Sequence, residues 1–330
     1  MMREWDENKL DHELEVLLNE IPEHDEFEKR IEKYINDRIR KIVHKTLAMT
    51  VIVAILLLAL VNPMFKVSFI DPTKRNENDT SIYFDVLRDY YETTRPYVEI
   101  VSLDAEYKGL AHYEVTMQAT NHRERLNVGR TNILYDLNCG TIKNLNDAQL
   151  YLMTYMGRFD NYLYQNDENW IKESIEELRK LPESSNIYIS LYTALPQAID
   201  ELRNANICLE WIEVYQPDVE YRGGLSLALS SAQDKTDLRY EISEAELIDV
   251  YCNNLKNLLE HKDMWKELSL PSTTVIYGDL SVLQDTYEDA LYLTELKTER
   301  FTLYGEKKDI IEFLENIDII SIQIDEITLY

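Results

Sequence analysis

The chain has 330 residues, and 45% of them are hydrophobic, which leaves room for two folded units that each bury a core. It holds 34 Lys and Arg against 61 Asp and Glu, and this net charge of −27 argues against nucleic-acid binding by the molecule as a whole. Cys139, Cys208 and Cys252 are widely spaced, which excludes a disulfide-rich scaffold, a thiolate zinc cluster and a CxxC redox pair.

Residues 1–45 predict an all-α arm that consists of two amphipathic helices. Helical periodicity places five apolar side chains on one stripe: Leu10, Leu14, Leu17, Leu18 and Ile21. Pro22 ends this helix, and a second stripe from Phe27 to Ile42 would continue into the next segment as one rod.

Charge divides this arm into two halves. Residues 1–28 hold 2 bases and 11 acids, a net charge of −9, whereas residues 29–45 hold 7 bases and 2 acids, a net charge of +5. The basic half suits a phospholipid headgroup layer. The acidic half is predicted to dock into a groove on a basic cytoplasmic protein, with three rim charges: Glu13, Glu15 and Glu20. A solvated spacer and a homo-oligomeric helix pair are the alternatives.

Residues 46–65 predict a single transmembrane helix. This stretch carries no charged residue. A helix of about twenty residues reaches about 30 Å, the thickness of the hydrocarbon core of a bilayer. A buried core helix is the alternative, and a cleaved signal peptide is disfavoured because 45 mostly acidic residues precede the span. Four basic residues lie at 38–45 and three at 66–75, which favours a cytoplasmic N-terminus and an extracytoplasmic C-terminal region.

The predicted outer region is α+β, with a membrane-proximal sheet module at 66–155 and a C-terminal sensor-like domain at 160–330. The first part predicts a helix and three strands, and a further helix leads into the second: 81–94, 97–107, 110–120, 130–138 and 169–181. Ser243 and Glu246 predict a capping box, and Gly223 and Gly224 a hairpin turn.

The second part contains two similar strand-helix-strand units. The first is predicted as a strand at 186–194, a helix at 195–205 and a strand at 206–216, and the second repeats this order from 299 to 330. An offset of 112 residues aligns several apolar positions of the two units, for example Leu191 with Leu303 and Leu202 with Leu314. Internal duplication and chance similarity both fit this alignment, and either gives helices packed on paired strands.

The outer region carries no GxSxG, HExxH or GxxxxGK motif. Its histidines are His112 in a predicted strand, His122 in a polar segment that suits a turn or an anion site, and His261 at a predicted helix end. We therefore predict no catalytic residue, no cofactor and no metal site, and we expect that the chain is not an enzyme.

The whole layout resembles the sigma factor regulator family of Gram-positive bacteria. The resemblance rests on the basic run RIRKIVHK before the span and on three outer segments: NIYISLYTALPQAIDEL, ICLEWIEVY and YGEKKDIIEFLENIDIISIQIDEI. It covers residues 25–120 and 160–328, and it implies a membrane-anchored anti-sigma factor. Many such proteins carry a zinc motif HxxxCxxC in the arm, but here the arm has His12 and His24 without a cysteine, so no zinc is expected.

This resemblance implies that the arm sequesters an extracytoplasmic-function sigma factor while the outer domain responds to the state of the cell envelope. Under this resemblance, the lipid bilayer and a second membrane protein are further candidate partners. Two other hypotheses remain. One is an anchored envelope protein whose outer domain binds a wall component or a partner, or is an enzyme, with the arm only as a tether. The other is a structural subunit of a membrane complex.

Overall fold

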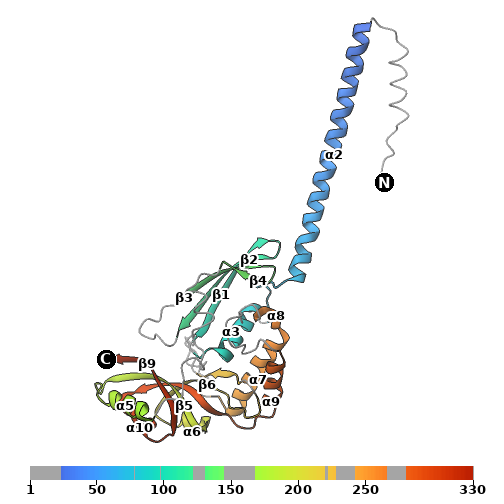
Figure 1. Ribbon diagram of the computed structural model, residues 1–330. Helices are drawn as coiled ribbons and strands as arrows, with labels where there is room; N and C mark the ends of the chain where they lie inside the picture. The colour runs from blue at the N-terminus through green and yellow to red at the C-terminus, as the bar shows by residue number, and fades with distance from the viewer. Residues whose placement is uncertain are drawn as a thin grey trace. The chain divides into compact units, whose positions relative to one another are not determined.

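The computed structural model describes residues 24–77, 79–96, 98–121, 131–144, 168–219, 222–227, 242–265 and 280–329. The chain divides into two compact units, Met1–Pro63 and Met64–Tyr330. Figure 1 shows the order of the helices and strands.

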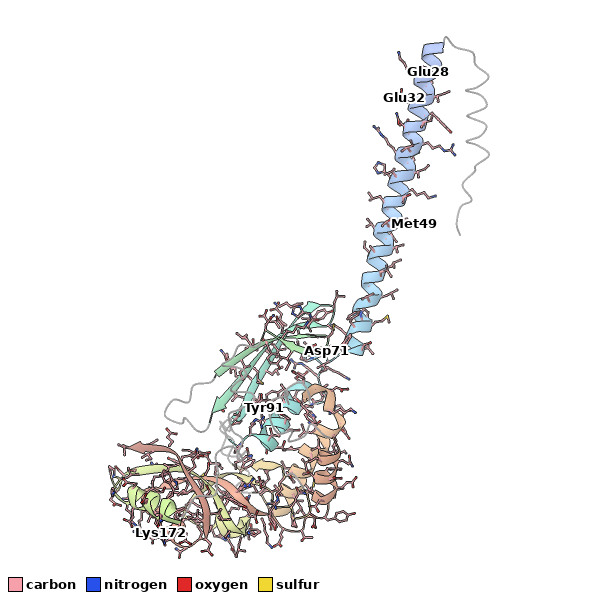
Figure 2. All side chains as sticks on the ribbon, in the orientation of Figure 1. Glu28, Glu32, Met49, Asp71, Tyr91 and Lys172 are labelled. Atoms are coloured by element: carbon pink, nitrogen blue, oxygen red, sulfur yellow. The ribbon has the colours of Figure 1, made fainter. Side chains whose placement is uncertain are left out.

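The first unit contains most of one long helix, α2 (His24–Ser68). Among the described residues, α2 is the one helix that is long and apolar enough to cross a membrane, and none of its most apolar stretch is buried by protein. Leu47, Ile52 and Leu60 each expose more than half of their side chain. In Figure 2, side chains project from all sides of the helix, with Glu32 and Met49 labelled. The prediction that the second stripe and the apolar segment form one rod is confirmed.

The second unit begins with a four-stranded antiparallel sheet in the order β1-β2-β3-β4. The three predicted strands are confirmed, and a short fourth strand follows them: β1 (Val98–Gly109), β2 (His112–Asn121), β3 (Thr131–Asn138) and β4 (Thr141–Lys143). Every second residue of β2, from Tyr113 to Ala119, is buried, so one face of this sheet forms part of the core.

Helix α3 (Ile82–Thr94) precedes this sheet and packs on β1. It begins where the sequence predicts, because the Ser81 hydroxyl accepts a hydrogen bond of 3.2 Å from the Phe84 amide and caps the first turn. Val86, Leu87 and Tyr91 are fully buried. The same helix also contacts elements from the second half of the chain.

The second sheet is antiparallel and has five strands in the order β7-β6-β8-β5-β9. Two strand-helix-strand units are present as predicted, β5-α6-β6 and β8-α10-β9, and their strand order β6-β8-β5-β9 is that of a split βαβ arrangement. The bounds are β5 (Ser185–Ala198), α6 (Ile199–Arg203), β6 (Cys208–Glu213), β7 (Gly224–Ser226), β8 (Lys297–Glu306), α10 (Lys307–Glu315) and β9 (Ile319–Leu329).

The strand register of this sheet relates the two strand-helix-strand units by the offset of 112 residues. Adding 112 to Ser190 gives Thr302, and these two residues face each other across the central β5–β8 pair. The same offset relates two further pairs. Moving each residue of the pair Ile212↔Phe301 to the equivalent position of the other strand-helix-strand unit gives Ile324↔Ile189, which is also observed. The units are thus related by a pseudo-two-fold axis through the Ser190–Thr302 pair, which supports internal duplication.

Helix α6 is shorter than its sequence predicts. The helix expected at 195–205 begins only at Ile199, because β5 resumes pairing with β8 after a bulge, through Gln197 and Ala198. Strand pairing with a distant segment overrides the local helical periodicity here.

The hairpin turn expected at Gly223 and Gly224 is wrong. Gly224 is the first residue of β7, and it pairs with Glu213 at the end of β6. A β-carbon on Gly224 would lie 1.7 Å from Cζ2 of Trp211, so this glycine makes room for the indole ring. Its role is packing rather than turn formation.

Four further helices complete the described part of the second unit: α5 (Glu168–Arg179), α7 (Glu244–Glu260), α8 (Lys262–Trp265) and α9 (Leu280–Ala290). The capping box of Ser243 and Glu246 is confirmed at the start of α7. One hydrophobic cluster joins α3 and the four-stranded sheet to the five-stranded sheet and its helices. The division into 66–155 and 160–330 stays a prediction.

Candidate functional site

The partner-binding surface predicted from the sequence lies outside the described residues. Its members are Leu10, Leu14, Leu17, Leu18, Ile21, Glu13, Glu15 and Glu20. Of the arm, the structure describes residues 24–45, where α2 exposes about half of the side chains of Ile35, Ile39 and Ile42. The second stripe is therefore an exposed apolar surface, and the first stripe stays a prediction.

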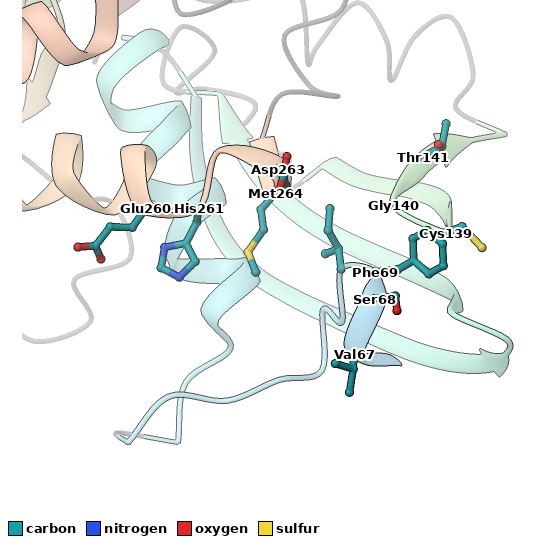
Figure 3. A pocket seen from close by; sticks show the side chains of 11 residues that line it. Val67, Ser68, Phe69, Cys139, Gly140, Thr141, Glu260, His261, Asp263 and Met264 are labelled. Carbon is teal, nitrogen blue, oxygen red and sulfur yellow. The ribbon is translucent and has the colours of Figure 1, made fainter. Parts of the chain in front are cut away.

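A cleft of about 520 Å³ lies at the start of the second unit (Figure 3). Three segments line it: residues 67–70, the β3–β4 loop with Cys139 and Gly140, and the chain around the α7–α8 turn at residues 260–264. Phe69 and Met264 are apolar, whereas Ser68 and Thr141 supply hydroxyl groups. Its volume is in the range of small-molecule sites.

His261 closes α7 at one side of this cleft, at the helix end that the sequence predicts. Its backbone N–H donates to the Asn257 carbonyl at 3.1 Å, and its ring Nδ1 lies 3.1 Å from the same oxygen. Glu260 and Asp263 flank this residue. Within the part of the chain that the structure describes, no three His, Cys, Asp or Glu side chains gather as metal ligands.

Helix α3 packs on β1 and makes buried or partly buried polar contacts with β6, β7 and α7. The Trp211 indole Nε1–H donates to the Glu92 carbonyl at 2.8 Å, and the Ser226 amide donates to Oε1 of Glu92 at 3.2 Å. Nδ2 of Asn257 on α7 donates to Oδ2 of Asp89 at 2.6 Å. Three contacts thus tie one turn of α3 to β6, β7 and α7.

The carboxyl group of Asp89 has a perturbed pKa. Burial raises the pKa of Asp89 from 3.8 to about 7, although the hydrogen bond from Asn257 and the charge of Arg88 act in the opposite direction. The charges of Glu92 and Asp85 add smaller upward contributions. Asp89 therefore exchanges its proton near neutral pH, at the contact between α3 and α7.

Two arginines and two glutamates form a partly buried cluster at the ends of β6 and β8. Nη1 of Arg222 lies 2.8 Å from Oε2 of Glu299, and Nη1 of Arg300 lies 3.4 Å from Oε2 of Glu213. The Arg300 guanidinium stacks over the ring of Tyr192 at 4.7 Å. The two charges of each sign balance, so the cluster fixes the loop after β6 rather than attracting a charged ligand.

This cluster was missed by sequence reasoning, because its four residues come from three separate segments. The remaining histidines add no chemistry to it: Nε2 of His112 lies 3.4 Å from Oδ1 of Asp136 on the neighbouring strand β3, and His122 lies outside the described residues.

Comparison of the chain with protein-family models, with curated proteins and with solved structures gives no match.

Proposed function

We propose that this chain is a membrane-anchored anti-sigma factor that sequesters an extracytoplasmic-function sigma factor through its N-terminal arm. In this proposal, the unit Met64–Tyr330 responds to the state of the cell envelope. The observation that carries it is the continuity of α2, in which one helix of 45 residues joins the arm to the candidate span. At a rise of about 1.5 Å per residue, this rod is about 68 Å long.

The orientation proposed for the span places the N-terminus in the cytoplasm. Basic residues at 38–45 precede the apolar stretch of α2 more densely than those at 66–75 follow it. Lys and Arg near the ends of a span are retained on the cytoplasmic side. The arm then faces the compartment in which a sigma factor is synthesised.

The charge of the arm fits such a partner. A sigma factor presents basic surfaces to promoter DNA, and residues 1–28 carry a net charge of −9. Acidic rims raise association rates with basic proteins, while an apolar stripe in a groove supplies most of the affinity.

The cleft of about 520 Å³ favours a second candidate function, an anchored envelope protein that binds a wall component through its outer unit. Under this alternative the arm is only a tether. The two candidates differ in whether a specific protein binds residues 1–45.

Affinity capture of the full-length chain tests the proposal. The protein, with a C-terminal tag, is expressed in the source organism, cross-linked in its membranes and purified, and bound proteins are identified by mass spectrometry. We expect one sigma factor to be recovered with the native chain. The double variant Leu14→Asp with Leu17→Asp should lose it by at least about tenfold, because two buried leucines contribute several kcal/mol to such a contact.

A matched control adds the same two charges to the other side of the same predicted helix. Helical periodicity places Asn8 and Asn19 opposite the stripe, so Asn8→Asp with Asn19→Asp should leave recovery unchanged. Equal recovery with both double variants contradicts the predicted surface. Recovery of no sigma factor with the native chain contradicts the anti-sigma proposal and favours the tether.

A further inference from the structure

The loop between β1 and β2 has an unusual residue for its geometry. Gly109 pairs with His112, so Leu110 and Ala111 form a two-residue hairpin loop, with φ values of +49° and +53°. Such loops favour Asn-Gly, because a residue with a β-carbon rarely adopts a positive φ. Turn geometry therefore does not account for a leucine at position 110.

The side chain of Leu110 is 47% exposed, whereas Ala111 is fully buried. A single exposed leucine is common in proteins. However, Val67 and Phe69, which directly follow the candidate span, are also exposed, at 89% and 38%. The second unit thus exposes the apolar side chains of Val67, Phe69 and Leu110.

Three contacts bring this loop to the same place as residues 66–70. The Cys139 amide in the β3–β4 loop donates to the Ala111 carbonyl at 3.0 Å. A β-carbon on Gly140 would lie 3.8 Å from Cδ1 of Ile70. Nζ of Lys66 lies 4.2 Å from the centre of the Tyr107 ring, near the end of β1.

Covalent geometry places residues 66–70 near a bilayer surface. They follow the uncharged stretch 46–65 directly, and each residue extends the chain by at most about 3.5 Å. Lysine and tyrosine, here paired as Lys66 and Tyr107, are typical of the headgroup region. Any loop that contacts these residues lies within reach of the lipid.

We propose that the β1–β2 loop rests on the lipid surface, with Leu110 entering the headgroup boundary beside Val67 and Phe69. The apolar side chain compensates there for the unfavourable backbone conformation. This proposal rests on the membrane anchoring in the proposed function and not on sigma binding, so either can fail without the other.

Fluorescence quenching by brominated lipids tests this contact. The full-length variant Leu110→Trp is reconstituted in vesicles of phosphatidylcholine and phosphatidylglycerol with brominated acyl chains, and the emission of the parent chain is subtracted. We expect the added emission to be quenched by about half or more, since interfacial groups lie about 5–10 Å deep. Leu195→Trp is the control, because Leu195 is 64% exposed in β5 of the other sheet.

Quenching of Leu110→Trp no greater than that of Leu195→Trp overturns the proposal. A blue shift that depends on protein concentration without lipid quenching also overturns it, because a second copy of the chain then covers the loop. If the tryptophan variant does not fold, a lipid that carries a photoreactive acyl chain is used with the unsubstituted chain. Labelling of residues 107–113 supports the contact, and labelling confined to α2 overturns it.

Discussion

In the four-stranded sheet, strands that are neighbours in space are neighbours in sequence, whereas the five-stranded sheet pairs β5 with β8 and β9 from the end of the chain. Two-residue loops set the register of the β1–β2 and β3–β4 pairs. In the second sheet, Ser190 meets Thr302 across 112 residues, and no turn connects them. Short loops restrict the first register, whereas the second depends on the burial of apolar side chains from segments far apart in sequence.

The largest expected effect comes from a glycine that packing requires. In Gly224→Ala, the new β-carbon collides with the Trp211 ring at 1.7 Å. We expect the free energy of unfolding to fall by more than about 3 kcal/mol, the upper range for overpacked sites. Denaturant unfolding of the full chain in detergent measures this change.

Gly109, next to the β1–β2 loop in the first sheet, is the counterpart of Gly224, and its backbone conformation rather than packing requires a glycine. Gly109 has a φ of +105° and no neighbouring atom within 4 Å of an added β-carbon. Gly109→Ala should cost about 1 kcal/mol, because only backbone strain opposes the methyl group. Equal losses for the two variants would show that the sheets do not differ in this way.

A third variant, Asp89→Asn, probes helix α3, which contacts strands of both sheets. The folded state raises the pKa of Asp89 to about 7, so between pH 4 and 7 the folded chain holds a proton that the unfolded chain has lost. Stability therefore falls as pH rises through this range.

Asp89→Asn removes this fall in stability with rising pH, while the amide oxygen of the new side chain still accepts the hydrogen bond from Asn257. Each pKa unit corresponds to about 1.4 kcal/mol, and the weaker hydrogen bond offsets part of the gain. We expect the variant to be more stable than the native chain by about 2 kcal/mol at pH 8, and by none near pH 4. Unfolding curves across pH 4–8 measure the difference, and a difference that does not change with pH would exclude Asp89 as its source.

A change of similar size to that of Gly109→Ala, but of opposite sign, is expected in the β1–β2 loop. Asparagine adopts a positive φ more readily than leucine, so Leu110→Asn should raise the free energy of unfolding in detergent by about 1 kcal/mol. The same change removes the apolar side chain, so the loop should lose its lipid contact. A fall in stability in detergent would show that Leu110 serves the fold itself.

Much of this fold follows from local pattern. The predicted helix at 81–94 corresponds to α3, and the three strands after it correspond to β1, β2 and β3. The alternation of apolar residues and the Ser81 cap are local signals, which survive because tertiary contacts agree with them.

Other features depend on partners that are distant in the chain. Helix α9 and strand β7 were not predicted, and β7 has only three residues, which is too short for a recognisable alternation. The hydrogen bonds from Trp211 and Asn257 to α3 join segments more than 100 residues apart in sequence. The cleft likewise combines three separate segments, so spacing within one motif gives no sign of it.

Helix α3 has a consequence for transplanting the second unit into another chain. Residues 82–94 contribute Tyr83, Leu87 and Tyr91 to the shared core, and they accept hydrogen bonds from Trp211 and Ser226. In a chimaera that takes α3 and the four-stranded sheet from another chain, Trp211 and Ser226 would face a helix that does not offer the matching acceptors. Exchange of this unit between chains should therefore succeed only when the whole stretch from Met64 to Tyr330 is moved together.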